Sequence, residues 1–510
     1  MRSFAVFVCM VLPWLNPVTS GPSPAVVQGL VTVVALAFIL LWATRLNWTE
    51  LIASAWLTAA LISALIGLLQ YFGFSATFQP WINTTDPGEA FGNLRQRNQF
   101  ATLTNIGMAA LLWWTADRRL KSADASGPSA QRWRMAAIAA ALLLALGNVA
   151  SSSRTGLVQL LLLLVMAWAW GRTAGRRGWS DQWAVLLAAA LAYLVAAFAL
   201  PALAGHNLQG SGIVARLHDG DSQCGSRLTL WSNVLHLIAQ KPWFGWGWGE
   251  LSYAHFMTLY PGERFCDILD NAHNLPLHLA VELGVPFSAA VCCLAAWLVW
   301  RARPWSETDA ARQLAWAVMA LILLHSMLEY PLWYGPFQMA FGLSAFLLMR
   351  APDRNPDDFE EAVPAPSGRL RWLAIVLLAA AAYVGWDYRR ISQIYLDPPL
   401  RAEAYREDTL EKIHDSWLFR NQVRFAELTI STVTLENAAH LHHLALDILH
   451  FSPEPRVVQK LLESAMLLGL TEEERLYRQR YQAAFAQNYA LWLQGKADDD
   501  PAEGAAPSSR

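Results

Sequence analysis

The chain has 510 residues, of which 55% are hydrophobic and only 15% are charged. This composition excludes an ordinary soluble globular protein, because the apolar residues gather into runs of about the 20 residues that cross a bilayer core. The net charge of −2 indicates no particular partner, and we expect no nucleic acid among the ligands. The sequence therefore predicts an all-α polytopic membrane protein.

The apolar runs predict about eleven transmembrane helices. In chain order they cover residues 4–19, 25–43, 51–72, 99–116, 135–151, 156–171, 183–204, 274–300, 313–331, 335–349 and 372–386. The first run could instead be a signal peptide cleaved after Ser20. We favour a retained span, because nothing after it resembles the start of a mature soluble domain, and both alternatives give the same topology.

The basic residues predict the orientation of these spans, since short cytoplasmic loops carry an excess of Lys and Arg. If the N-terminus is cytoplasmic, the inner loops hold most of them: Arg45, Arg118, Arg119, Lys121, Arg132, Arg134, Arg172, Arg176, Arg177, Arg301, Arg303, Arg312, Arg350, Arg354, Arg369 and Arg371. The outer segments hold far fewer. We therefore place residues 205–272 and the chain after about residue 387 on the outer face, which is the periplasm if the membrane is a bacterial inner membrane.

Five parts follow from this topology. They are an N-terminal transmembrane bundle (1–204), a large periplasmic loop (205–272), the C-terminal transmembrane helices (273–386), a periplasmic helical domain (387–495) and a disordered tail (496–510). The helical domain repeats apolar positions at helical spacing between Pro and Gly residues, which predicts stacked, tetratricopeptide-like hairpins. Its composition predicts that the tail is disordered.

Two of the five cysteines, Cys224 and Cys266, fall in the large outer loop. The outer side is oxidising if it is a bacterial periplasm, so we predict a disulfide between them, with two free thiols as the alternative. Cys9, Cys292 and Cys293 lie within predicted spans, where a thiol behaves as a small apolar group.

Unusual polar residues gather where spans meet the outer face, and polar groups at such positions tend to mark function. The arginines among them oppose the positive-inside rule, and a guanidinium fork fits phosphate oxygens. We therefore expect an anionic ligand at the outer leaflet, such as a lipid-linked phosphate or diphosphate. For a single arginine the alternative is interfacial snorkelling. The candidates are Arg95, Gln96, Arg97, Asn98, Arg154, Arg216, Arg227, Arg264, His273, Asn274, Glu329 and Tyr330.

No residue pattern predicts a metal or cofactor. His278 with Glu282 and His325 with Glu329 are spaced four apart on a helical face, and we interpret both pairs as structural support rather than zinc ligands. The histidines at 440, 442, 443 and 450 lack a Cys or acidic residue that completes a ligand set. The glycines of PWFGWGWGE have no strand before them, so we expect tight turns with Trp anchors rather than a nucleotide loop.

Together these residues resemble the O-antigen ligase and polymerase superfamily, and within it the protein O-oligosaccharyltransferase (pilin glycosylation ligase) branch. The matching pieces run in the family's order and cover most of the membrane region. They are GNLRQRNQ at 92–99, SSSRTG at 151–156, RLTLW at 227–231, PWFGWGWG at 242–249, AHNLPLHLAVELG at 272–284 and HSMLEYPLWY at 325–334.

The resemblance implies transfer of a glycan from undecaprenyl diphosphate to a Ser or Thr hydroxyl of a periplasmic protein such as pilin, without a metal. His273 matches the essential histidine of the family's HN motif and is expected to act as the base. Arg154 and Arg227 match its diphosphate-associated arginines. Substrate contacts are expected from Arg95, Gln96, Arg97, Asn98, Asn274, Glu329 and Tyr330, whereas Arg216 and Arg264 match no motif.

Two alternatives stay open. Within the superfamily, the chain could be an O-antigen ligase that uses lipid A core as acceptor, or a repeat-unit polymerase. The C-terminal helical domain of over a hundred residues favours the protein-directed branch. Outside it, a transporter or flippase is expected to show internal repeats and midplane polar groups, whereas here the polar groups cluster at one surface.

Overall fold

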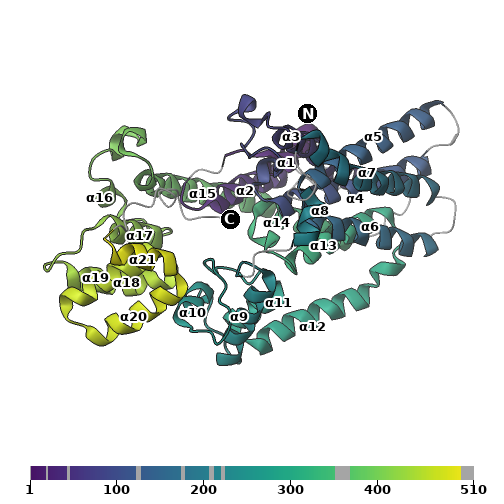
Figure 1. Cartoon of the computed structure of the whole chain (residues 1–510). Helices are drawn as coiled ribbons and strands as arrows, with labels where there is room; N and C mark the ends of the chain where they lie inside the picture. The colour runs from purple at the N-terminus through teal and green to yellow at the C-terminus, as the bar shows by residue number, and fades with distance from the viewer. Residues whose placement is uncertain are drawn as a thin grey trace. The chain divides into compact units, whose positions relative to one another are not determined.

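The computed structural model describes residues 2–18, 21–42, 46–121, 128–173, 179–205, 212–219, 224–350 and 368–495. Every regular element in these ranges is a helix (Figure 1), which confirms the predicted all-α class. The predicted disordered tail, residues 496–510, lies outside the described residues.

The helices of the chain run in the following order. The α-helices are α1 (Arg2–Leu15), α2 (Pro24–Trp42), α3 (Trp48–Tyr71), α4 (Arg97–Lys121), α5 (Pro128–Ala150), α6 (Arg154–Thr173), α7 (Trp179–Leu203), α8 (Gly212–Asp219), α9 (Arg227–Gln240), α10 (Leu251–Met257), α11 (Leu275–Leu283), α12 (Val285–Ala302), α13 (Ala310–Ser326), α14 (Gly335–Met349), α15 (Gly368–Ser392), α16 (Thr409–Ile413), α17 (Arg420–Ile430), α18 (Ala438–Phe451), α19 (Pro455–Leu468), α20 (Thr471–Ala484) and α21 (Ala486–Leu493).

Seven of the described helices are long and apolar enough to cross a membrane: α2, α3, α5, α6, α7, α12 and α15. Three shorter apolar helices, α1, α13 and α14, also coincide with predicted spans. The protein is thus a multi-pass membrane protein, and ten of the predicted spans each coincide with a single helix. α4, which covers the predicted fourth span, has a charged C-terminal end, TADRRLK, that lowers its mean hydropathy.

The predicted eighth span, 274–300, is wrong as a continuous helix. The chain breaks at Gly284, whose φ of 91° ends α11 before α12 begins. A Cβ at Gly284 would meet the carbonyl oxygen of Trp243 at 2.1 Å, so the neighbouring backbone segment needs a glycine there. The apolar run continues on both sides of Gly284, so nothing in the sequence indicated the break. His278 and Glu282 therefore lie in α11, outside the spanning helix.

The described chain forms two compact units. The first comprises Met1–Thr19, Ala25–Gly220 and Trp297–Ala381, and its helices share one apolar core. Small residues bring these helices close together: a Cβ at Gly107 would meet the Cβ of Ala60 at 2.3 Å, and one at Gly147 would meet that of Ala64 at 2.8 Å. Close backbone approach at small residues is typical of helix packing in membranes.

The second unit comprises Ser20–Pro24, Asp221–Ala296 and Ala382–Arg510. Its C-terminal helices pack around a core of their own, and Phe256 of α10 belongs to that core. The same helix is held at its start, where His450 of α18 contacts the Glu250 carboxylate at 2.7 Å and stacks on Tyr253 at 3.8 Å between ring centroids. The large loop and the C-terminal helical domain are thus packed together.

Candidate functional site

In the first unit, the polar cluster begins at the start of α4. The short 3₁₀ helix η2 (Gly92–Leu94) ends at Arg95, whose φ of 58° turns the chain into α4. The side-chain amides of Gln96 and Asn98 then both donate hydrogen bonds to the carboxylate of Glu329, one to each oxygen. Three of the predicted substrate-binding residues are therefore brought together, although Glu329 is 231 residues away from Asn98.

Asn98 extends this cluster to the junction between α5 and α6. Its side-chain oxygen accepts a hydrogen bond from the Ser153 hydroxyl, which in turn accepts the Gly156 N–H at 3.0 Å. The junction turns sharply at Ser152, whose φ is 52°. Arg154 follows as the first residue of α6. The hydrogen bonds that hold the turn therefore also fix the position of Arg154.

Behind the amides lies a buried layer that supports them. The Thr102 hydroxyl lies 2.9 Å from Nδ1 of His325 and 3.1 Å from the side-chain oxygen of Gln159. His325 is fully buried, and its Nε2 is 3.8 Å from the Glu329 carboxylate. His325 is thus a buried residue that contacts Thr102 and lies near Glu329, which agrees with the structural role interpreted from its spacing to Glu329.

Three arginines near this cluster contact neighbouring segments of the first unit. Arg95 donates to the side-chain oxygen of Asn83 at 3.3 Å, and Arg97 forms an ion pair with Glu89. Arg216 of α8 donates to the carbonyl oxygen of Ser152 at 3.3 Å, which gives it a role in holding the turn before α6. Tyr330 stacks on Tyr334, with ring centroids 6.0 Å apart.

In the second unit, His273 has a rare backbone conformation. Its φ is 49°, in the left-handed region that non-glycine residues seldom adopt. The buried Asn271 stabilises it by accepting the His273 N–H at 2.8 Å. Asn274 follows as the N-cap of α11 and accepts the Leu277 N–H at 3.1 Å. Such strained positions persist at functional sites when their surroundings hold them.

Asn271 thus supports the predicted base His273, although it was not among the predicted site residues. The signal was present, since an Asn side chain can bind the backbone two residues further on, but nothing in the sequence showed a positive φ at His273. At the neighbouring Asp270, burial raises the pKa of the carboxyl group, and the charge of His273 opposes that shift.

Arg227 is brought to the same region by α9. It is the first residue of that helix, which Ser226 caps by accepting the Thr229 N–H at 3.1 Å. One turn later, Trp231 donates its indole N–H to the carbonyl oxygen of Ala272 at 3.1 Å. Residues four apart lie on one helical face. Arg227 therefore lies on the face of α9 that contacts the backbone directly before His273.

The predicted disulfide is present, and it joins Cys224 to Cys266 with Cα atoms 5.3 Å apart. It closes the loop that carries α9 and α10, three residues before Arg227. Arg264, next to this bridge, donates to the carbonyl oxygens of His255 and Thr258, each at 2.9 Å. These contacts stabilise the C-terminal end of α10, so the structure gives Arg264 a structural role.

Reducing this disulfide is expected to destabilise the loop. The bridge spans 42 residues, and loop-closure entropy assigns about 4 kcal/mol to a loop of that size. Thermal unfolding of the detergent-solubilised protein, with and without reductant, measures the change. The Cys292→Ser variant is a matched control that should respond to reductant as the wild type does. An unchanged melting temperature on full reduction would contradict the prediction.

His278 and Glu282 support the loop beside α11. His278 Nε2 is 3.5 Å from the Glu282 carboxylate, which also accepts the Gly249 N–H at 3.0 Å. Burial lowers the pKa of His278 to about 4, and the charge of His273 adds to this effect. Burial also raises the pKa of Glu282 to about 7. The lowered pKa favours a neutral His278 imidazole at neutral pH, so its 3.5 Å contact with Glu282 is not a full ion pair.

No cluster of three or more His, Cys, Asp or Glu side chains that could hold a metal occurs among the described residues. The histidines of the helical domain contact separate carboxylates: His440 lies 3.0 Å from Glu427, and His442 lies 3.0 Å from Glu473. The expected absence of a metal or cofactor stays a prediction.

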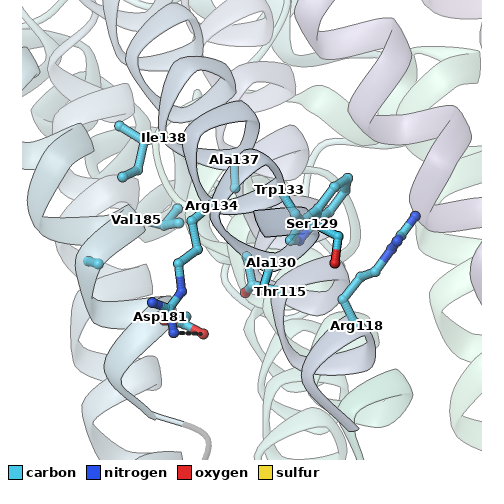
Figure 2. Close-up of a pocket in the computed structure, with 11 residues that line it drawn as sticks. Thr115, Arg118, Ser129, Ala130, Trp133, Arg134, Ala137, Ile138, Asp181 and Val185 are labelled. Atoms are coloured by element: carbon cyan, nitrogen blue, oxygen red, sulfur yellow. Dashed lines mark hydrogen bonds and ion pairs between the residues drawn. The ribbon is translucent and has the colours of Figure 1, made fainter. Parts of the chain in front are cut away.

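A surface pocket, drawn in Figure 2, is lined by residues near the C-terminal end of α4, whereas the polar cluster lies at the start of that helix. Arg118 lines it about 30 Å along the helix from Asn98, at 1.5 Å per residue. Within it, Arg134 of α5 pairs with Asp181 of α7 at 3.1 Å, and the Arg118 guanidinium lies 4.6 Å from the centre of the Trp133 ring. The pocket is separate from the predicted site.

Three protein-family models match parts of the chain that contain the residues described above. The O-Antigen ligase model matches residues 139–292, the Protein glycosylation ligase model matches 90–114, and the model called Virulence factor membrane-bound polymerase, C-terminal, matches 313–498. These matches confirm the resemblance of the chain to the O-antigen ligase and polymerase superfamily and, within it, to the protein O-oligosaccharyltransferase branch.

A particular relative is the General O-oligosaccharyltransferase of Acinetobacter baylyi. The chain is 24% identical to it over 348 residues, which cover 66% of this chain and 56% of the relative. The chain thus matches a little over half the length of that curated protein.

Loss of the Asn271 side chain is expected to slow the glycan transfer that the resemblance implies, with His273 as its predicted base. Asn271→Ala removes the acceptor that holds the His273 N–H, and a reacting group misplaced by about 1 Å can cost about 100-fold in rate. Asn271→Asp keeps a side-chain oxygen at the same place and is the matched control. Initial rates of glycan transfer measure both. Equal rates for Asn271→Ala and wild type would show that the contact does not position His273.

Proposed function

We propose that the protein is a glycosyltransferase, a protein O-oligosaccharyltransferase. It moves a glycan from undecaprenyl diphosphate to Ser or Thr hydroxyls of periplasmic proteins such as pilin. The observation that carries this proposal is the conformation of His273, which Asn271 holds directly before Asn274 caps α11. The similarity to the protein glycosylation ligase model and to a general O-oligosaccharyltransferase supports the same activity.

In the proposed reaction, His273 is the base. The acceptor hydroxyl oxygen forms a bond to the anomeric carbon of the glycan, and its proton passes to the imidazole. The bond from that carbon to the diphosphate oxygen breaks, and the oxygen keeps the electron pair, so undecaprenyl diphosphate leaves. A positioned base of this kind supplies about 10²–10⁴-fold in rate.

Arg154 and Arg227 are proposed to stabilise the charge that builds on the leaving diphosphate. Each is the first residue of its helix, where the positive end of the helix dipole already favours an anion and disfavours a cation. An arginine at such an end is more favourable when it has a phosphate to bind. A guanidinium also binds phosphate oxygens in pairs, so both residues suit a diphosphate ligand.

The proposed location is the bacterial inner membrane, with the site at the periplasmic face. This rests on the excess of Arg and Lys in the loops assigned to the cytoplasm. The C-terminal helical domain is then periplasmic, with tetratricopeptide-like helical hairpins, and available to an acceptor protein. No metal or cofactor takes part in the proposed mechanism.

The test is co-expression with a lipid-linked glycan pathway and a pilin, followed by mass spectrometry of the pilin. Glycan on a Ser or Thr of the pilin, lost when the gene is omitted, is the expected result. Unmodified pilin in a strain whose lipid-linked glycan is intact would overturn the protein-directed proposal.

A second candidate function is favoured by the O-Antigen ligase match over residues 139–292. In that function the acceptor is lipid A core, and the same lipid-linked donor is used. Glycan that appears only on lipopolysaccharide in the co-expression experiment would select it. The chemistry assigned to His273 stays the same, since both acceptors present a hydroxyl group.

A further inference from the structure

Three large aromatic side chains project from the segment between α9 and α10. Trp243 is 73% exposed, Phe244 is 89% exposed and Trp248 is 69% exposed. A turn that faces water does not require large apolar side chains. Exposed apolar side chains that lie close together in the chain indicate a surface that contacts a membrane or a partner. We call these three residues the wedge.

Backbone hydrogen bonds fix the wedge segment to the end of α11. The Trp246 N–H donates to the carbonyl oxygen of Val281 at 2.8 Å, and the Gly247 N–H donates to that of Glu282 at 3.0 Å. A Cβ at Gly245 would meet the carbonyl group of Glu282 at 2.3 Å, so only glycine permits this approach. The wedge and α11 therefore move as one body, and α11 begins directly after His273 and Asn274.

The same segment touches the start of the spanning helix α12. The Val285 N–H donates to the carbonyl oxygen of Pro242 at 2.8 Å. Val285 and Phe287, in the first turn of α12, are also exposed and apolar. Because α12 is long and apolar enough to cross the membrane, its first turn lies at the membrane surface, and the wedge beside it lies at the same level.

We propose that the wedge inserts into the outer leaflet and so sets the depth of His273 relative to the membrane. Trp is enriched where protein meets the lipid headgroups. Lys241, which directly precedes the segment, holds its ammonium group 4.0 Å from the centre of the Trp246 ring and is exposed. At the membrane surface, that position suits contact with lipid phosphates. The partner is therefore a lipid surface.

Spin labels measure the insertion without any enzyme assay. Single cysteines at Phe244 and Trp248 are labelled in full-length protein whose free cysteines have been replaced and whose disulfide is intact, in vesicles of phosphatidylethanolamine and phosphatidylglycerol. The expected result is high accessibility to dissolved oxygen and low accessibility to a water-soluble nickel chelate. A label at Glu263, an exposed position of the same loop, is the control and should show the reverse order.

Two results would overturn the proposal. Wedge labels with the accessibility of the Glu263 label would place the wedge in water. Wedge labels shielded from both oxygen and the nickel chelate would show that protein covers it, from this chain or a second copy.

The consequence for His273 is tested with two triple variants, and this part rests on the proposed function. Trp243, Phe244 and Trp248 are all replaced by Ser in one variant and by Leu in the other. We expect the Ser variant to lose about tenfold or more in transfer rate, since each side chain gives up apolar burial, and the Leu variant to stay near wild type. If the Ser and Leu variants transfer glycan at equal rates while the labels show an inserted wedge, the wedge inserts into lipid but does not set the depth of His273. Absence of transfer in the wild type would refute the proposed function alone.

Discussion

His273→Ala is expected to lower the rate of glycan transfer by about 10²–10⁴-fold, which is the range that a positioned base contributes. The imidazole is the group proposed to take the proton of the acceptor hydroxyl, and the alanine side chain cannot do so. Transfer to a purified acceptor, measured with lipid-linked donor in excess, gives the rate. Protein level and membrane insertion should stay unchanged, because His273 is partly exposed and contributes little to the core.

The alanine variant has a second effect that needs a control. Residue 273 has a φ of 49°, and a left-handed conformation costs most non-glycine residues about 1–2 kcal/mol. Asn tolerates this region better and cannot act as a base at neutral pH. His273→Asn should therefore be as inactive as His273→Ala while keeping the local backbone. Transfer near the wild-type rate in His273→Asn would rule out the base.

The polar clusters show how far the sequence predicts the site. Gln96, Asn98 and Glu329 were each recognisable as polar residues at the end of an apolar run, and they do meet. Their pairing was not predictable, because it depends on how α4 packs against α13 and not on local spacing. The role of Asn271 was missed for a similar reason: it depends on the backbone conformation of His273.

The fold, too, was predictable from the sequence only in part. Apolar runs of spanning length predicted the membrane helices, because burial in lipid requires them wherever they occur. The break at Gly284 was hidden, since it depends on the backbone of Trp243 approaching from 41 positions earlier in the chain. The packing of Phe256 into the core of the C-terminal helices was hidden too, because an apolar residue in a loop gives no sign of its distant partner.

Glu329→Gln is expected to destabilise the first unit and to reduce transfer with it. Glu329 is buried, and its two oxygens accept the amides of Gln96 and Asn98. A glutamine at 329 has one oxygen and no charge, so both hydrogen bonds lose their ionised acceptor, and the Gln96 amide has to turn to accept the new NH₂ group. Hydrogen bonds to charged groups contribute about 1.5–3 kcal/mol, against about 0.5–1.5 kcal/mol for neutral ones. Thermal unfolding of the solubilised protein measures the loss of stability, and initial transfer rates measure the loss of activity.

The exchange variant separates the hydrogen bonds from the identity of the residue. In Gln96→Glu combined with Glu329→Gln, the new carboxylate at 96 accepts from the amide at 329, whose oxygen still accepts from Asn98. All donors are then satisfied, and the stability lost in Glu329→Gln should return. If activity returns as well, Glu329 acts by holding Asn98 and, through it, Ser153 at the turn before Arg154. If stability returns and activity does not, the carboxylate at 329 itself contacts substrate. A single Glu329→Gln variant as stable as the wild type would contradict the arrangement from which both conclusions follow.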